Sequence, residues 1–422
     1  MSEPVDQLFF PQLTGHGHDR DMPTHLEVAH AIGRKMCKEA IWWNDRCTWQ
    51  GLSHQLVNLK SELVMRTLSP ALYDGLAGVA LFLAELSVRV KDEVVEATLA
   101  GAINNLIDQL EVPQLNSVFG LYKGQLGLGY ALWRMGSLRA NRGWVDKGLS
   151  ALYALTEKQI PAHELDVVSG VAGAIPVWLK LHKAEQAPEF LEQAVLAGDL
   201  LLAKAHKGPQ LCSWECIPDE PAGADYAQGA AGISLALLAL YEVTGQQAYK
   251  EVAEKGFAFV QEGWSVHADE NWLNGAPGIA LAWLRACELT GDKQYEQQAI
   301  AALEATCHAI GMQVKNIYGT NFSLAKGLAG NAAVLLEGSR VLHRSAPIQS
   351  GAERCARVAQ EVAELGTMLY HATGTDWPGG VPVPPEEGYH HVHPSLMLGM
   401  AGTGLFYLGF EENPPDSVLL MR

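Results

Sequence analysis

The chain has 422 residues, of which 48% are hydrophobic and 18% charged, and its formal net charge is -17 at pH 7. This composition is typical of a globular protein with a large core and excludes a predominantly disordered chain. The acidic excess argues against nucleic acid or an anionic membrane surface as the main partner, because both would repel the protein.

The seven cysteines are odd in number and scattered, and no charged segment followed by an apolar one opens the chain. No apolar run reaches the ~18 residues that a membrane-spanning helix needs. We therefore expect a cytoplasmic protein with reduced cysteines and no membrane span. We expect a single domain over residues 1–422, in which residues 1–24 form a flexible N-terminal segment.

Three of the eleven tryptophans lie close together, at positions 42, 43 and 49. Tryptophans in such a group could grip a peptide. The simpler interpretation is that they pack the first helix against the rest of the protein.

A Gly-x-x-Gly pair then recurs along the chain, and each pair leads into an apolar stretch. A fixed internal repeat is the mark of an architecture built from equivalent units. The pairs are Gly75/Gly78, Gly124/Gly127, Gly170/Gly173, Gly229/Gly232, Gly275/Gly278, Gly327/Gly330 and Gly399/Gly402.

Amphipathic segments lie between the pairs, and their spacing predicts helices over 92–111, 188–207, 247–263, 294–310 and 352–370. A helix that is apolar all round must be buried on all sides, whereas an amphipathic one faces solvent. We therefore predict an all-α, closed α/α toroid of seven helical hairpins, with an inner apolar ring and an outer amphipathic ring. The glycines should allow tight turns and close approach at the start of each inner helix. The seven turns should gather at one end, around a shared cavity.

The stretches around these glycines resemble the lanthionine synthetase C-like family, most closely the cyclase domain of the bifunctional lanthipeptide synthetases. The resemblance extends over about residues 25–410. The stretches that carry it are 72–83, 166–173, 226–233, 272–279, 323–331 and 394–402.

The resemblance implies a zinc ion held by a cysteine and by a Cys-His pair, which activates a peptide cysteine for addition to dehydroalanine or dehydrobutyrine. A metal-bound thiol loses its proton, while a free thiol is largely protonated at neutral pH. Here the ligand positions hold Leu273, Ala325 and Lys326. The family's catalytic histidine is replaced by Gln228, and an expected arginine by Asp269. We therefore expect no zinc and no other cofactor.

Other residues could supply a substitute metal site. Cys212 and Cys216 have a suitable spacing for two ligands, and His390, His391 and His393 form a cluster. Packing and a solvated loop are the simpler interpretations. Cys307 and His308 lie in an expected outer helix and are interpreted as packing residues. Residues 372–394, rich in Pro and Gly, are expected to form a long surface loop or a lid.

Two functions are compatible with these residues. The first is a zinc-independent cyclase that assists thiol addition in a ribosomally made precursor peptide. Its expected catalytic residues are Asp166, Lys326 and Gln228, and its expected substrate-binding residues are Asp74, Tyr226, Trp272, Asn274 and Asp269. The alternative, purely structural roles are a helix N-cap for Asp166 and a solvent-exposed position at the cavity rim for Lys326.

The second function is a scaffold that binds a peptide or a partner enzyme without chemistry. A glycosidase or terpene-cyclase relative is weaker, because the turns offer no diagnostic pair of carboxylates. The chain carries no kinase signature, so we expect a separate dehydratase or kinase/lyase to supply the dehydrated peptide.

Overall fold

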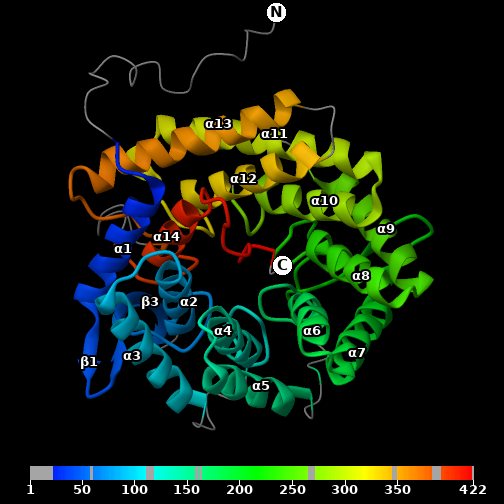
Figure 1. The fold of residues 1–422 in the computed structure, drawn as a ribbon. Coiled ribbons are helices and arrows are strands. Elements are labelled where there is room, and N and C mark those ends of the chain that lie inside the picture. The colour runs from blue at the N-terminus through cyan, green and yellow to red at the C-terminus, as the bar shows by residue number, and fades with distance from the viewer. Residues whose placement is uncertain are drawn as a thin grey trace, which may run out of the picture.

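The chain folds into two concentric layers of helices around a common axis (Figure 1). The structure, a computed structural model, describes residues 22–57, 60–110, 118–156, 160, 164–264, 271–344, 349–382 and 391–420. The predicted all-α toroid is confirmed. None of the described helices is long and apolar enough to cross a membrane.

The inner layer consists of the helices that follow the Gly-x-x-Gly pairs. These helices are mostly apolar, with a few charged residues, and in the first of them every residue is buried. They are α2 (Leu76–Ser87), α4 (Gln125–Leu138), α6 (Val171–Glu185), α8 (Ala230–Thr244), α10 (Ala276–Thr290), α12 (Leu328–Arg344) and α14 (Met400–Leu408).

The outer layer consists of amphipathic helices, each packed on an inner partner. They are α3 (Glu93–Leu110), α5 (Arg142–Thr156), α7 (Pro188–Lys204), α9 (Gln247–Gly263), α11 (Lys293–Lys315) and α13 (Gln349–Gly366), together with α1 (His25–Glu39). The predicted outer helix over 352–370 is divided in the structure, because α13 ends at Gly366 and a π-helical turn, Thr367–His371, follows it.

Helices from opposite ends of the chain complete the ring. Each of α2, α4, α6, α8, α10 and α12 packs on the outer helix that follows it, whereas α14 packs on α1. A capping box between Thr24 and Glu27 begins α1. The seventh hairpin is therefore made from two distant segments, and this closes the circle without an exposed end.

Three small two-stranded sheets interrupt the helices. They are β1 (Ile41–Trp43) with β2 (Arg46–Thr48), β3 (Gln50–Val57) with β4 (Lys60–Thr67), and β5 (His206–Lys207) with β6 (Cys212–Ser213). Trp49 is buried and its indole nitrogen donates to the Met36 carbonyl of α1, 2.8 Å away. Trp43, in contrast, is 75% exposed. The packing role expected for the tryptophans is thus confirmed for Trp49, and the half-exposed ring of Trp42 also lies against Gly101 of α3.

Candidate functional site

The turns that precede the inner helices gather at one end of the ring, which we call the loop face. Six of the seven junctions between neighbouring turns carry a backbone hydrogen bond, made by the residue two positions before the first glycine or by its neighbour. The bonds run from Ala325 N to Met397 O, Met397 N to Tyr73 O, Tyr73 N to Tyr122 O, Tyr122 N to Val168 O, Val167 N to Ala227 O, and Ala227 N to Leu273 O, with distances of 2.8 to 3.1 Å. The loop face is therefore held together by main-chain groups.

The glycines make this arrangement possible. A Cβ built on Gly278 would overlap the carbonyl oxygen of Trp272, and one built on Gly232 would overlap that of Tyr226. In both turns the second glycine packs on the carbonyl six residues before it. The close approach predicted from the sequence is therefore present, and any larger side chain would have to displace backbone.

Side chains on the two sides of each turn have opposite environments. The residue immediately before the first glycine is exposed or partly exposed, whereas the residue three positions before that glycine is buried. Among the sequence-predicted residues, Lys326, Gln228 and Asn274 are exposed and Asp74 is partly exposed, whereas Tyr226 and Trp272 are buried. The predicted substrate-binding set is thus split between the surface of the loop face and the interior below it, and Asp269 lies outside the described residues.

Asp166 occupies a position that recurs in neighbouring repeats, four residues before the first glycine. Its Oδ1 accepts a hydrogen bond from Ser169 N at 2.6 Å. Asp225 Oδ1 accepts from Gln228 N at 2.7 Å. Asn271 Oδ1 accepts from Leu273 N at 3.0 Å and from Asn274 N at 3.2 Å. All three side chains close their turns in the same way.

Asp166 and Asp225 nevertheless differ from ordinary surface carboxyls. Burial raises the pKa of Asp166 above its usual value, against the opposing effects of the turn's backbone N–H groups and of Lys123. Burial also raises the pKa of Asp225, and the charge of Asp166 adds to that rise. Two neighbouring carboxyls with raised pKa values at one end of a ring are candidates for proton transfer.

A cavity of about 290 Å³ opens beside Gln228. Cys216 lies in its wall, and burial together with the charges of Asp166 and Asp225 raises the pKa of this thiol to about 12. The cavity is lined by residues that include Cys216, Glu220, Asp225, Gln228, Trp264 and Asn274. The cavity thus brings together two of the predicted residues, Gln228 and Asn274, with the carboxyl groups of Glu220 and Asp225.

Sequence reasoning missed Trp264 and Glu220. It counted Asp225 only among turn carboxylates without a diagnostic spacing, and it weighed Cys216 only as a metal ligand. The signal for Asp225 was present, because it lies four residues before Gly229, as Asp166 does before Gly170. No such spacing marks the other three. They reach the cavity from the segment that leads into the turn and from the end of α9, which only the folded chain brings together.

Comparison with known proteins agrees with this architecture. Residues 66–420 match the family described as lanthionine synthetase C-like protein. This chain belongs to that family. Nisin cyclase has a similar structure, with a TM-score of 0.57 and 14% identity over 80% of this chain and 87% of that one. At such low identity the likeness shows the fold alone. No curated protein matches the sequence at a significant level.

Several glycoside hydrolases also match the structure, with lower scores. An unsaturated glucuronyl hydrolase from Streptococcus agalactiae has a TM-score of 0.43 and 10% identity over 93% of this chain and 92% of that one. A family 76 glycoside hydrolase from a bovine Bacteroides thetaiotaomicron strain has a TM-score of 0.39 and 12% identity over 68% of this chain and 71% of that one. Both scores are too low to support an argument about function.

The zinc that the lanthionine synthetase C-like family implies does not fit the residues present. Leu273 is partly buried against the hydrophobic core and Ala325 is fully buried, and neither has a donor atom. Lys326 is exposed at the rim, and a lysine amine is a poor zinc ligand beside cysteine or histidine. Within the ranges that the structure describes, no three His, Cys, Asp or Glu residues are grouped so that they could hold a metal.

The residues considered for a substitute metal site lie apart from the cavity or reach it singly. Cys212 is buried on β6, while Cys216 lines the cavity. His393 is buried, with Nδ1 2.7 Å from Ser395 Oγ, and its ring lies close to Gly51 of β3. Burial lowers the pKa of His393, against the opposing charge of Asp74. His390 lies outside the described residues.

The remaining two expectations concern α11 and the predicted lid. Cys307 is buried, whereas the neighbouring His308 is exposed, so the two do not face a common site. The described part of the predicted lid lies on the loop face, where Phe322 N donates to Pro378 O at 2.8 Å and Gly380 N to Leu398 O at 2.8 Å. Trp377 of this segment is buried. Residues 383–390 lie outside the described ranges, and a lid function stays a prediction.

Proposed function

We propose that this chain assists, without zinc, the addition of a peptide cysteine thiol to a dehydroalanine or dehydrobutyrine residue at the loop face. The family membership supports a lanthipeptide cyclase-like function. One observation supports the zinc-free chemistry. The cavity beside Gln228 has Cys216 in its wall, and that thiol is within electrostatic reach of buried Asp166 and partly buried Asp225, while the ligand positions offer no donor set.

Asp166 is the proposed general base. Burial raises its pKa, so its carboxylate binds a proton more readily than an exposed one and is better matched to a thiol near neutral pH. The thiol proton passes to Asp166, and the sulfur forms a bond to the β-carbon of the dehydro residue. The carbon–carbon π pair moves toward the adjacent carbonyl as an enolate. A proton returned to the α-carbon completes the thioether.

The other proposed residues act on charge and position. The Gln228 amide lines the cavity and can donate a hydrogen bond to the enolate oxygen, although it cannot exchange a proton as histidine does. Lys326 is exposed at the same face, where its charge can stabilise that enolate. Holding thiol and acceptor together can supply several kcal/mol of barrier reduction. The substrate is then a ribosomally made precursor peptide dehydrated by a separate dehydratase or kinase/lyase.

A synthetic peptide with one cysteine and one dehydroalanine tests the proposal. We expect the protein to consume the free thiol faster than the spontaneous reaction, at a rate that a zinc chelator leaves unchanged. Asp166→Asn should lower this rate about 100-fold, the low end for loss of a general base. Asp146→Asn, on the exposed side of α5, is the charge-matched control and should leave it unchanged.

Three results would contradict parts of this proposal. Inhibition by the chelator would show that the activity needs a metal. A larger loss of rate in Asp225→Asn than in Asp166→Asn would show that Asp225, and not Asp166, is the general base. Thiol loss at the spontaneous rate would show that the protein does not catalyse the addition, and would favour the second function, a peptide-binding scaffold. The absence of the family's ligands, together with Gln228 in place of the catalytic histidine, is consistent with that function. Binding of the same peptide would then be the property to measure.

A further inference from the structure

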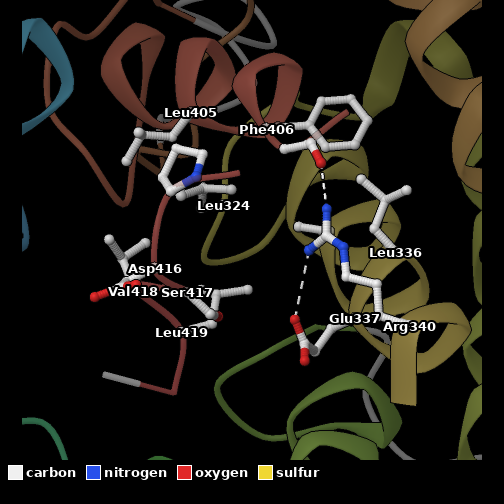
Figure 2. A pocket seen from close by; sticks show the side chains of 13 residues that line it. Leu324, Leu336, Glu337, Arg340, Leu405, Phe406, Asp416, Ser417, Val418 and Leu419 are labelled. Carbon is white, nitrogen blue, oxygen red and sulfur yellow. Dashed lines mark hydrogen bonds and ion pairs between the residues drawn. The ribbon is translucent and has the colours of Figure 1, made fainter. Parts of the chain in front are cut away.

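A segment of the chain lies inside the ring, in the space enclosed by the inner helices. We call residues 413–420 the lumen segment. Figure 1 shows it in red at the centre of the ring, and Figure 2 shows it facing α12 and α14 from close by. It also borders α2 and α4. Leu419 and Leu420 are buried below the loop face.

The ring holds this segment through polar groups as well as apolar contact. Two carbonyls of the segment accept hydrogen bonds from the turns of the loop face, Val418 O from Tyr122 OH at 2.7 Å and Leu419 O from Trp272 Nε1 at 3.3 Å. At the opposite end, Asn413 O accepts from Arg89 Nη2 at 2.6 Å. Carbonyls bonded at both ends describe a peptide that is held partly through its backbone, and its last residues close a turn through Leu420 N and Ser417 O.

The carboxylate of Asp416 lies between two cations from different helices. Lys180 Nζ of α6 is 2.5 Å from Asp416 Oδ2, and Arg134 Nη1 of α4 is 3.4 Å from the same atom. Arg134 also pairs with buried Glu85 of α2 at 3.2 Å. Without the carboxylate of Asp416, the two cations would face each other across the ring wall without a shared counter-ion.

These two cations belong to the loosest junction of the inner ring. Every other pair of adjacent inner helices is closely packed, but α4 and α6, both described in full, are not. Their junction is spanned by side chains, among them Trp133 Nε1, which donates to Glu185 Oε1 at 2.6 Å. Asp416 therefore bridges the ring at the place where helix packing contributes least.

The packing of the lumen segment is that of a docked peptide. A cavity of about 60 Å³ remains between it and α12 and α14, where Figure 2 shows Leu324, Leu336, Leu405 and Phe406. Core elements seldom leave a gap larger than a water molecule. The segment thus occupies a groove wider than itself.

We propose that the lumen is a binding groove for a peptide with an acidic residue followed by apolar ones, and that the lumen segment is its resident intramolecular occupant. Docking joins α4 to α6 through Asp416 and fills the inside of the ring. Any peptide handled at the loop face is then excluded from the lumen. Because the segment is covalently attached, its high effective concentration keeps the groove filled against free peptides.

The first test uses the full chain and hydrogen exchange. Asp416→Asn should speed amide exchange in α4 and α6 by about tenfold or more, and should leave α10 and α12 unchanged, because the bridge acts at one junction. Glu412→Gln, an exposed change of the same charge four residues earlier, is the control. Equal exchange in Asp416→Asn and in the control would overturn the proposed bridge.

The second test asks whether the groove binds a peptide. Leu419→Asp places a charge at a buried position and should release the segment. A fluorescently labelled synthetic peptide with the sequence of residues 411–420 should then bind this variant and not the unchanged protein, whose groove is filled. The same peptide with Asp416→Asn should bind at least tenfold more weakly. Binding to both proteins alike, or to neither, would overturn the groove. If Leu419→Asp does not fold, the exchange experiment alone decides the proposal.

Discussion

The loop face and the lumen are built from the same inner helices, yet they are stabilised by different kinds of interaction. At the loop face, equivalent turns bond to one another through main-chain groups, with glycines at every close contact. In the lumen, individual charged side chains such as Glu85, Arg134 and Lys180 form the network that holds a segment with no internal repeat.

This difference explains how the side chains of the turns can vary without loss of the fold. Leu273 and Ala325 take part in the ring of turns through their backbone groups alone, Leu273 through its carbonyl and Ala325 through its N–H. Their side chains can therefore change while the turns stay in place. The lumen lacks this freedom, because its contacts depend on the identity of each side chain.

The largest expected effect comes from breaking a turn of the loop face. Gly278→Ala would push a Cβ into the Trp272 carbonyl, where only backbone movement can relieve the overlap. We expect a loss of about 3 kcal/mol in the free energy of unfolding, the upper part of the range for overpacking, measured by denaturant titration. Gly143→Ala is the control, since a Cβ there meets only the Asn141 side chain at 3.4 Å on an exposed helix. A small loss for Gly278→Ala would mean that the turns are pliable.

The next effect concerns the lumen network. Glu85 is 3% exposed and pairs with Arg89 at 2.9 Å and with Arg134 at 3.2 Å. Glu85→Gln removes the carboxylate that Arg89 and Arg134 share and leaves Arg134 with Asp416 alone. We expect a loss of about 2 kcal/mol, below the range for a fully buried pair. Glu96→Gln removes a comparable partner of Arg139 at the surface and should cost less than about 0.5 kcal/mol. Equal losses would show that burial adds nothing to the lumen pairs.

The sequence predicted the loop face better than the lumen for the same physical reason. A turn that recurs seven times leaves a pattern of glycines, and that pattern located the turns and the inner helices. The outer helix over 247–263 was predicted with the bounds it has, because its amphipathic pattern is regular. The lumen segment occurs once, is short, and carries no motif. Its path depends on ion pairs between Asp416 and cations from two other helices. No spacing in the sequence predicts these pairs.

A smaller effect distinguishes the outer layer from the loop face. The hydrogen bond from His30 holds the pKa of Asp92 down to about 2, with the N-terminus of α3 and Arg34 adding to it. A lowered pKa contributes stability that is present above the ordinary value and is lost as pH falls toward 2. Asp92→Asn should therefore cost about 1 to 2 kcal/mol at pH 7, because its partners are partly exposed, and almost nothing near pH 2. Unfolding measured across this range checks the slope, and a constant difference would exclude the ion pair as its cause.

The smallest expected effect has the opposite sign. Burial raises the pKa of Asp166, so its charged form is disfavoured in the folded chain, and the stability it contributes in acid is lost as pH rises through its folded pKa. Asparagine keeps the Oδ1 that accepts from Ser169, and the equivalent position in another repeat is Asn271. Asp166→Asn should therefore be slightly more stable than the unchanged protein at pH 7 and equally stable in acid, by denaturant titration at both pH values. A variant that gains stability and loses thiol addition would mark Asp166 as a residue retained for chemistry, since a purely structural carboxyl would be better served by the amide. A variant less stable at pH 7 would show instead that the turn needs the negative charge, with Lys123 as its partner.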